Sequence, residues 1–112
     1  MVAYDEDLAD RIRELLDGEP GLTEKRMFGG LAFLVGGNMA VAASGQGGLL
    51  LRVAPGRSDA LVASSNASRA EMRGRSMTGW LRVAPEHVRT KRQLSRWVQL
   101  ATAYTRSLPA KR

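Results

Sequence analysis

The chain has 112 residues, 44% of them hydrophobic, and we expect one domain spanning residues 1–112 around a single core. The absence of cysteine excludes disulfide bonds, thiolate metal sites and a cysteine nucleophile. The acidic N-terminus lacks the features of a secretory signal, and no apolar run approaches the roughly 20 residues of a membrane span, so we expect a cytoplasmic protein that does not associate with membranes.

The net charge of +6 is unevenly distributed along the chain. Residues 1–19 contain seven acids and two arginines, a charge of −5, so residues 20–112 carry +11. A basic body of this kind attracts nucleic acid or acidic protein surfaces. The alternative is an arginine-rich surface that only keeps a small protein soluble.

Residues 4–16 predict an amphipathic helix. Their apolar residues recur at steps of three and four, which places Tyr4, Leu8, Ile12 and Leu15 on one face. Acidic residues at positions 5–7 complement the dipole at the start of a helix. Gly18 and the Glu-Pro-Gly sequence that follows it end the helix.

Residues 25–53 predict an antiparallel meander, because four short apolar runs are separated by glycine clusters. Eight of the twelve glycines lie between positions 29 and 56, and glycine adopts the positive φ that tight turns require. Gly29 and Gly30 indicate either a hairpin turn or a bulge within one long bent strand. The sequence does not decide between these two alternatives.

The rest of the chain predicts a short helix at residues 58–64, an edge strand at about 70–73, a strand at 80–83 and a final helix from about 86 to 108. The final helix has an apolar stripe formed by Leu94, Trp97, Ala101, Tyr104 and Leu108. The chain is therefore predicted to be an α+β protein with two layers, an antiparallel sheet with flanking helices in the order α-β(3 or 4)-α-β(1 or 2)-α.

Catalytic patterns are not found in the sequence. His87 is the only histidine, the acids are dispersed, and no serine or glycine cluster completes a nucleophile elbow or a phosphate-binding loop. We therefore expect no enzymatic activity, no metal and no cofactor. Nucleic-acid binding is an alternative function, because four basic residues gather at the start of the final helix: Arg89, Lys91, Arg92 and Arg96.

Residues 25–30 read Lys-Arg-Met-Phe-Gly-Gly, and an apolar strand, a glycine turn and a second strand that opens with Met39 follow. A later strand ends in Arg52, and a last strand that starts at Trp80 leads into the closing helix. With this ordered set, residues 5–108 resemble the N-terminal domain of the TfoX/Sxy family, the regulators of bacterial natural competence.

The resemblance implies a fold related in shape to the secretion-chaperone-like folds. It also implies a regulatory role through protein contacts, without known catalysis or cofactor. Because the C-terminal helical domain of the full-length regulators is missing after Arg112, it implies a stand-alone domain that keeps partner binding. The partner is then another protein, or a second copy of the chain in a homodimer.

The matched residues suggest an interaction surface. An unpaired guanidinium is costly to bury, so we expect Arg26 and Arg52 to project to the same polar face of the sheet. Met27 and Phe28 are either core or contact residues. The candidate interaction surface comprises Arg26, Met27, Phe28, Gly29, Gly30, Arg52 and Trp80.

Overall fold

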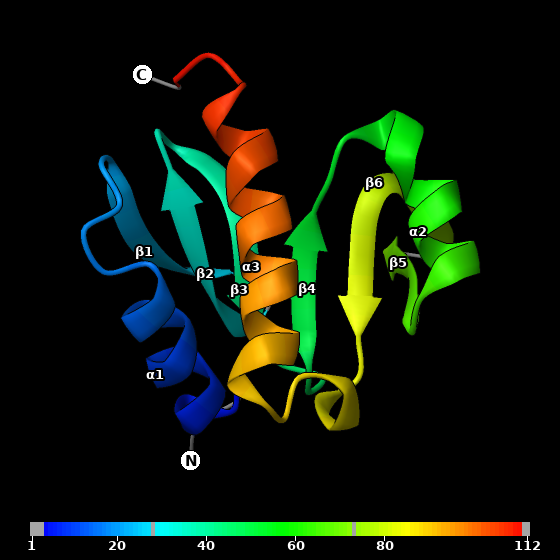
Figure 1. Cartoon of the computed structure of the whole chain (residues 1–112), viewed down its shortest axis with the longest axis horizontal. Helices are drawn as coiled ribbons and strands as arrows, with labels where there is room; N and C mark the ends of the chain where they lie inside the picture. Colours follow the sequence, from blue (N-terminus) through cyan, green and yellow to red (C-terminus); the bar gives the residue numbers. More distant parts are fainter. Residues whose placement is uncertain (1–3, 28, 73, 111–112) are drawn as a thin grey trace.

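The computed structural model describes residues 4–27, 29–72 and 74–110, which form one open sheet with helices packed on it (Figure 1). In chain order the elements are α1 (Glu6–Leu15), β1 (Leu22–Met27), β2 (Gly30–Val35), β3 (Asn38–Ala43), β4 (Leu49–Arg52), the 3₁₀ turn η1 (Pro55–Arg57), α2 (Ser58–Ser64), β5 (Ala67–Met72), β6 (Arg75–Val83), the 3₁₀ turn η2 (Pro85–His87) and α3 (Lys91–Arg106). The predicted α+β fold and its order are confirmed, with four strands before α2 and two after it.

The sheet of the described residues has six strands in the order β1-β2-β3-β4-β6-β5, and all neighbours are antiparallel. β1 and β2 form a hairpin, not one bent strand, since Met27 pairs with Gly30. Gly29 has a φ of 77°, which glycine adopts without steric cost. Gly30 is already part of β2, so of the two glycines only Gly29 lies in the turn.

A β-bulge in β3 determines which side chains face each side of the sheet. Phe33 pairs with Val41 but Leu34 pairs with Met39, which leaves Ala40 as the extra residue. The alternation of side chains along β3 therefore shifts by one position at Ala40. Val41 joins Phe33 in the core under the helices, whereas Met39 faces the other side.

All three helices of the described residues contribute to the main core on one face of the sheet. In Figure 1, α3 crosses over β3 and β4, with α1 beside it and α2 over β5 and β6. Ile12, Phe33, Leu51 and Leu81 are fully buried there. Full burial of one such side chain contributes roughly 1.5–3 kcal/mol to the free energy of unfolding, so this face supplies most of the stability.

The helix ends are fixed by capping side chains. In α1, Asp5 accepts a hydrogen bond from the Leu8 N–H at 3.1 Å. The last helix starts at Lys91, later than the predicted residue 86, because Thr90 and Gln93 form a reciprocal capping box and the preceding residues form η2. The Thr-x-x-Gln spacing at residues 90–93 is the sequence signal for this start.

Ion pairs join elements on the helix-covered side. Arg13 of α1 donates from Nε and Nη2 to the two carboxylate oxygens of Glu24 in β1, at 2.7 and 2.8 Å. Arg106 of α3 donates to both oxygens of Glu19, from Nε at 3.0 Å, and the Glu19 side chain is only 7% exposed. These hydrogen bonds hold the pKa values of Glu19 and Glu24 below the usual range for glutamate.

Candidate functional site

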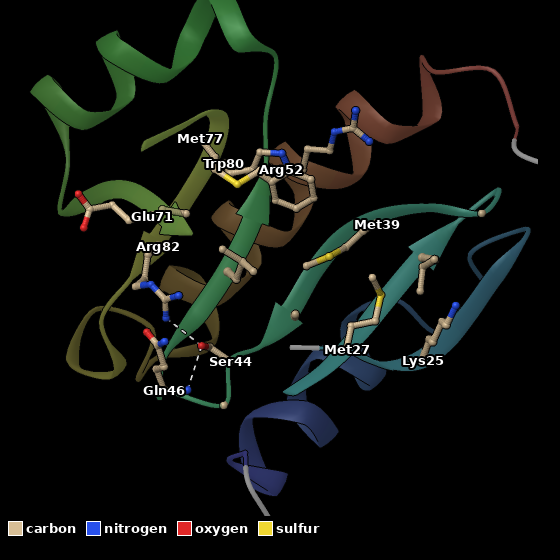
Figure 2. Close-up of a pocket in the computed structure, with 16 residues that line it drawn as sticks. Lys25, Met27, Met39, Ser44, Gln46, Arg52, Glu71, Met77, Trp80 and Arg82 are labelled. Carbon is tan, nitrogen blue, oxygen red and sulfur yellow. Dashed lines mark hydrogen bonds between the residues drawn. The ribbon is translucent and has the colours of Figure 1, made fainter. Parts of the chain in front are cut away.

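No helix of the described residues covers the second face of the sheet, and this face is hollowed into a groove of about 470 Å³ (Figure 2). The size lies within the range of known ligand pockets. Strands from both halves of the sheet line the groove, from β1 on one side to β5 and β6 on the other. We call this feature the open-face groove.

The floor of the groove is apolar. Met39 and Ala42 are buried there, and Met27, Leu34, Leu50 and Trp80 are half-buried on the same side. Methionine side chains are flexible and polarizable, so they adapt to differently shaped apolar partners. The floor therefore offers apolar contact without a rigidly defined shape.

Arginine side chains stand beside this floor. Arg52 pairs with Trp80 across β4 and β6, and Arg82 pairs with Leu50 in the same ladder. The Arg52 guanidinium lies 5.4 Å from the centre of the Trp80 ring and 5.7 Å from the centre of the Tyr104 ring in α3. Both distances allow cation–π attraction, so two rings from different layers of the protein hold this guanidinium.

The Arg82 guanidinium is held by the loop that follows β3. Its Nη1 donates to the Ser44 hydroxyl at 2.8 Å, and the same hydroxyl accepts from the Gln46 N–H at 3.1 Å (Figure 2). Ser44 is buried, so its position is fixed by the loop. The remaining N–H groups of Arg82 make no other side-chain hydrogen bond within the described part of the chain.

The two arginines of the groove have no acidic partner among the described residues, whereas three arginines elsewhere in the protein do. Arg13, Arg69 and Arg106 form ion pairs with Asp10 or Glu24, Asp59 and Glu19 respectively. Among the described residues, neither Arg52 nor Arg82 forms an ion pair, although both are half-buried. With Lys25, the lining has three cations and one carboxylate, that of Glu71.

The structure separates the two arginines that we expected on one face. Arg26 lies with its guanidinium 6.0 Å from the centre of the Tyr4 ring, on the side of the sheet that α1 covers. Arg52, by contrast, lines the open-face groove. The expectation was wrong because the two residues lie in different strands. Which face each residue takes depends on how the strands pair, and the sequence alone does not give that pairing.

Of the other predicted surface residues, Met27 and Trp80 line the groove with Arg52. The backbone of Gly30 packs so closely that a Cβ there would lie 2.2 Å from the Ala43 carbonyl oxygen. Gly29 is an exposed turn residue next to it. Phe28 is outside the described residues.

The interaction surface predicted from the sequence did not include Lys25, Met39, Ser44, Met77 and Arg82, all of which line the groove. One signal for Arg82 was present. In the segment from Trp80 to Val83 the aliphatic residues Leu81 and Val83 alternate with Trp80 and Arg82, which predicts that Trp80 and Arg82 share the face opposite Leu81. For the other four residues, nothing in the sequence predicts that their segments of the chain meet at the groove.

The basic residues at the start of α3 lie away from the groove. Arg89, Lys91, Arg92 and Arg96 are all exposed, and Arg96 lies 5.6 Å from the centre of the Trp97 ring. Arg11 of α1 donates to the Arg89 carbonyl at 2.9 Å, which positions the start of this segment. The structure thus contains two separate basic regions, one on each side of the sheet.

The described residues contain no group of three or more histidine, cysteine, aspartate or glutamate side chains arranged to hold a metal ion. Within the same residues, no helix has both the length and the apolar composition that crossing a membrane requires.

The fold defines a two-layer α+β domain with one helix-covered face and one open face. Comparison with protein families matches residues 14–104 to the TfoX N-terminal domain. The chain belongs to this family, which confirms the resemblance seen in the sequence and supports a regulatory, competence-related role. A search of curated proteins finds no match.

Proposed function

We propose that the chain is a regulatory domain that acts by binding another protein in the open-face groove. The observation that carries this proposal is the combination of an apolar floor with half-buried arginines that have no carboxylate partner among the described residues. Apolar anchors beside arginines are typical of protein-binding surfaces. The proposal places the protein in the cytoplasm.

Site-specific photocrosslinking in the source organism tests the proposal. Benzoylphenylalanine replaces Met77 in the groove and, in a matched control, Ser95 on α3. We expect a crosslinked protein from position 77 that is absent from position 95 and is lost when Arg82→Glu is added. The captured protein must then bind the purified chain and bind the Arg82→Glu variant more weakly.

The same product from both positions, or a product that Arg82→Glu leaves unchanged, would contradict binding in the groove. The unfolding transition of each variant is measured alongside, so that loss of the product is compared between folded proteins only.

Nucleic-acid binding through α3 is the second candidate function. One observation favours it: Lys91 and Arg92 occupy the first turn of α3, which contains no acid. Cations at a helix N-terminus oppose the helix dipole, so the sequence keeps them there at a small cost in stability. A bound phosphate would pair with these cations and would also interact favourably with the N-terminus of the helix.

Titration of labelled duplex and single-stranded DNA and RNA at low and near-physiological salt tests this second candidate. If Arg89, Lys91, Arg92 and Arg96 meet four phosphates, the logarithm of the duplex DNA affinity falls with the logarithm of salt at a slope of about −3.6. The triple variant Arg89→Glu, Arg92→Glu, Arg96→Glu should abolish the binding. Absence of binding at low salt excludes nucleic acid as a direct ligand.

A further inference from the structure

We infer that the open-face groove recognises an acidic amphipathic segment of the partner, with apolar side chains on the methionine and leucine floor and carboxylates on Arg52 and Arg82. This inference rests on the proposed function and names the chemistry of its partner. It is carried by the charges, the burial and the hydrogen bonds of the groove.

The floor selects the apolar part of the ligand. Met27, Leu34, Leu50 and Trp80 are half-buried without a covering element, next to the buried Met39. Apolar surface of this kind is stabilised when another apolar group removes it from water. The opposite face of the same sheet shows the completed arrangement, in which helices α1 and α3 supply those groups.

The guanidiniums select the charge of the ligand. The groove has three cations against the single carboxylate of Glu71, which is itself exposed. Elsewhere in the protein Arg13 and Arg106 each donate twice to one carboxylate, the paired geometry that guanidinium favours. Arg52 and Arg82 have that capacity available, and a partner carboxylate complements it.

Both guanidiniums are held in place before a ligand arrives. Ser44 positions Arg82 by a hydrogen bond, and the rings of Trp80 and Tyr104 hold Arg52. A side chain that is already ordered loses less conformational entropy on binding. The arginines are therefore suited to recognise a carboxylate at a defined place beside the floor.

The acidic helix of a second copy does not supply this ligand. The apolar side chains of α1, Leu8 and Ile12 among them, are buried in the core of their own chain. A second copy can offer the acids of α1 without the apolar side chains that the floor requires. We therefore assign the occupant to a segment of another protein that has both.

A nucleic acid is also a poor match to this site. Sheets that bind single strands stack successive bases on several aromatic side chains. In the described lining Trp80 is the only aromatic side chain, and methionine, leucine and alanine form the rest of the floor. Carboxylates joined to aliphatic side chains fit this composition better than phosphates joined to bases.

Selection from a library of random linear peptides displayed on phage tests the inference. The purified whole chain is the bait, and bound peptides are sorted by whether Arg52→Glu with Arg82→Glu prevents their capture. We expect the groove-dependent peptides to be rich in aspartate or glutamate beside leucine, isoleucine or phenylalanine. Selection against the doubly reversed variant should enrich lysine and arginine in place of the acids.

Synthetic copies of the selected peptides give the quantitative measurement. The double reversal should weaken their binding at least tenfold, and the milder pair Arg52→Gln with Arg82→Gln should weaken it by a smaller factor. The matched control, Arg92→Glu with Arg96→Glu on α3, carries the same change of charge and should leave binding within twofold. Peptide binding should also change the fluorescence of Trp80, which the Trp80→Phe variant removes while the buried Trp97 remains.

The outcomes separate the inference from the proposed function. Groove-dependent peptides without acidic residues would overturn the acidic partner and leave protein binding in the groove standing. If the double substitutions of Arg52 and Arg82 and the Trp80→Ala variant leave the binding of every selected peptide unchanged, both the inference and the proposed function are overturned. Displacement of the peptides by a single-stranded oligonucleotide at equal affinity would assign the groove to nucleic acid instead.

Discussion

Leu50 and Leu51 are neighbours in β4, and they lie on opposite faces of the sheet. Leu51 is fully buried under the helices, whereas Leu50 is half-buried in the open-face groove. The same contrast holds on β6 between Leu81 and its neighbours Trp80 and Arg82. One face is completed by the chain itself, and the other has apolar surface and charge that a second molecule can complete.

The two faces of the sheet also differ in the partners of their arginine side chains. On the helix-covered side, Arg13 joins α1 to Glu24 of β1, and Arg106 joins α3 to Glu19 in the loop after α1. In the groove, the arginines are positioned by a hydroxyl and by aromatic rings, which hold a guanidinium without neutralising it. Incomplete burial together with arginines that lack an acidic partner among the described residues is what supports our proposal that the open face binds a partner.

The largest expected effect comes from the two leucines of β4. Leu51→Ala should lower the free energy of unfolding by about 2–5 kcal/mol, because it leaves a cavity in a closed core. Leu50→Ala should lower it by about 1 kcal/mol or less, since that side chain already contacts water. Urea denaturation measures both, and equal losses would contradict the distinction between the two faces.

The next effect tests the close backbone contact at Gly30, the first residue of β2 after the hairpin turn. A Cβ at Gly30 would lie 2.2 Å from the Ala43 carbonyl oxygen, so Gly30→Ala should lower the free energy of unfolding by about 1–3 kcal/mol. Gly56→Ala is the control, because no heavy atom lies within 4 Å of its Cβ position. Thermal unfolding of the two variants gives the comparison, and a Gly30 variant as stable as the Gly56 variant would contradict the close contact.

Ion pairs on the helix-covered side give a smaller effect that depends on pH. The hydrogen bonds of Arg106 and Arg13 lower the pKa values of Glu19 and Glu24 from 4.5, so their stabilisation is present above that pH and is lost as pH falls through the folded pKa. Glu19→Gln should lower the free energy of unfolding at neutral pH by up to about 1 kcal/mol and weaken its acid dependence. Arg82→Gln should leave the acid dependence as it is.

Unfolding in urea between neutral and acidic pH measures this dependence, with Asp17→Asn as the control, an exposed acid outside the ion pairs of the described residues. The same acid dependence in Glu19→Gln and in the unsubstituted protein would show that the pair with Arg106 contributes nothing.

The smallest expected effect on stability is that of Arg82→Gln itself. It removes one hydrogen bond from a half-exposed guanidinium to Ser44, so the free energy of unfolding should fall by no more than about 1 kcal/mol. The same variant should nevertheless weaken peptide binding in the groove. Stability lost by several times that amount, with binding unchanged, would make Arg82 a structural residue.

The strands and helices could be predicted from periodicity, glycine and proline because these signals are local. Of the predicted apolar stripe, Leu94, Trp97 and Ala101 are buried, whereas Tyr104 is half-buried and Leu108 is half-buried beyond the end of α3. The groove could not be predicted, because facing depends on how the strands pair. Arg26 and Arg52 look equivalent in the sequence, as each is an arginine next to an apolar residue in a predicted strand, but the register places them on opposite sides.

The extra residue Ala40 has a further consequence. It acts as a phase shift within β3, so that one short strand supplies Met39 to the groove and Val41 to the core under the helices, with an alanine between them. Without it, the two ends of β3 could not both keep their present neighbours in β2, because alternation would turn one of them over. The presence of Met39 in the groove thus depends on a single extra residue in the strand, and the face that a β3 side chain takes has to be assigned separately before and after Ala40.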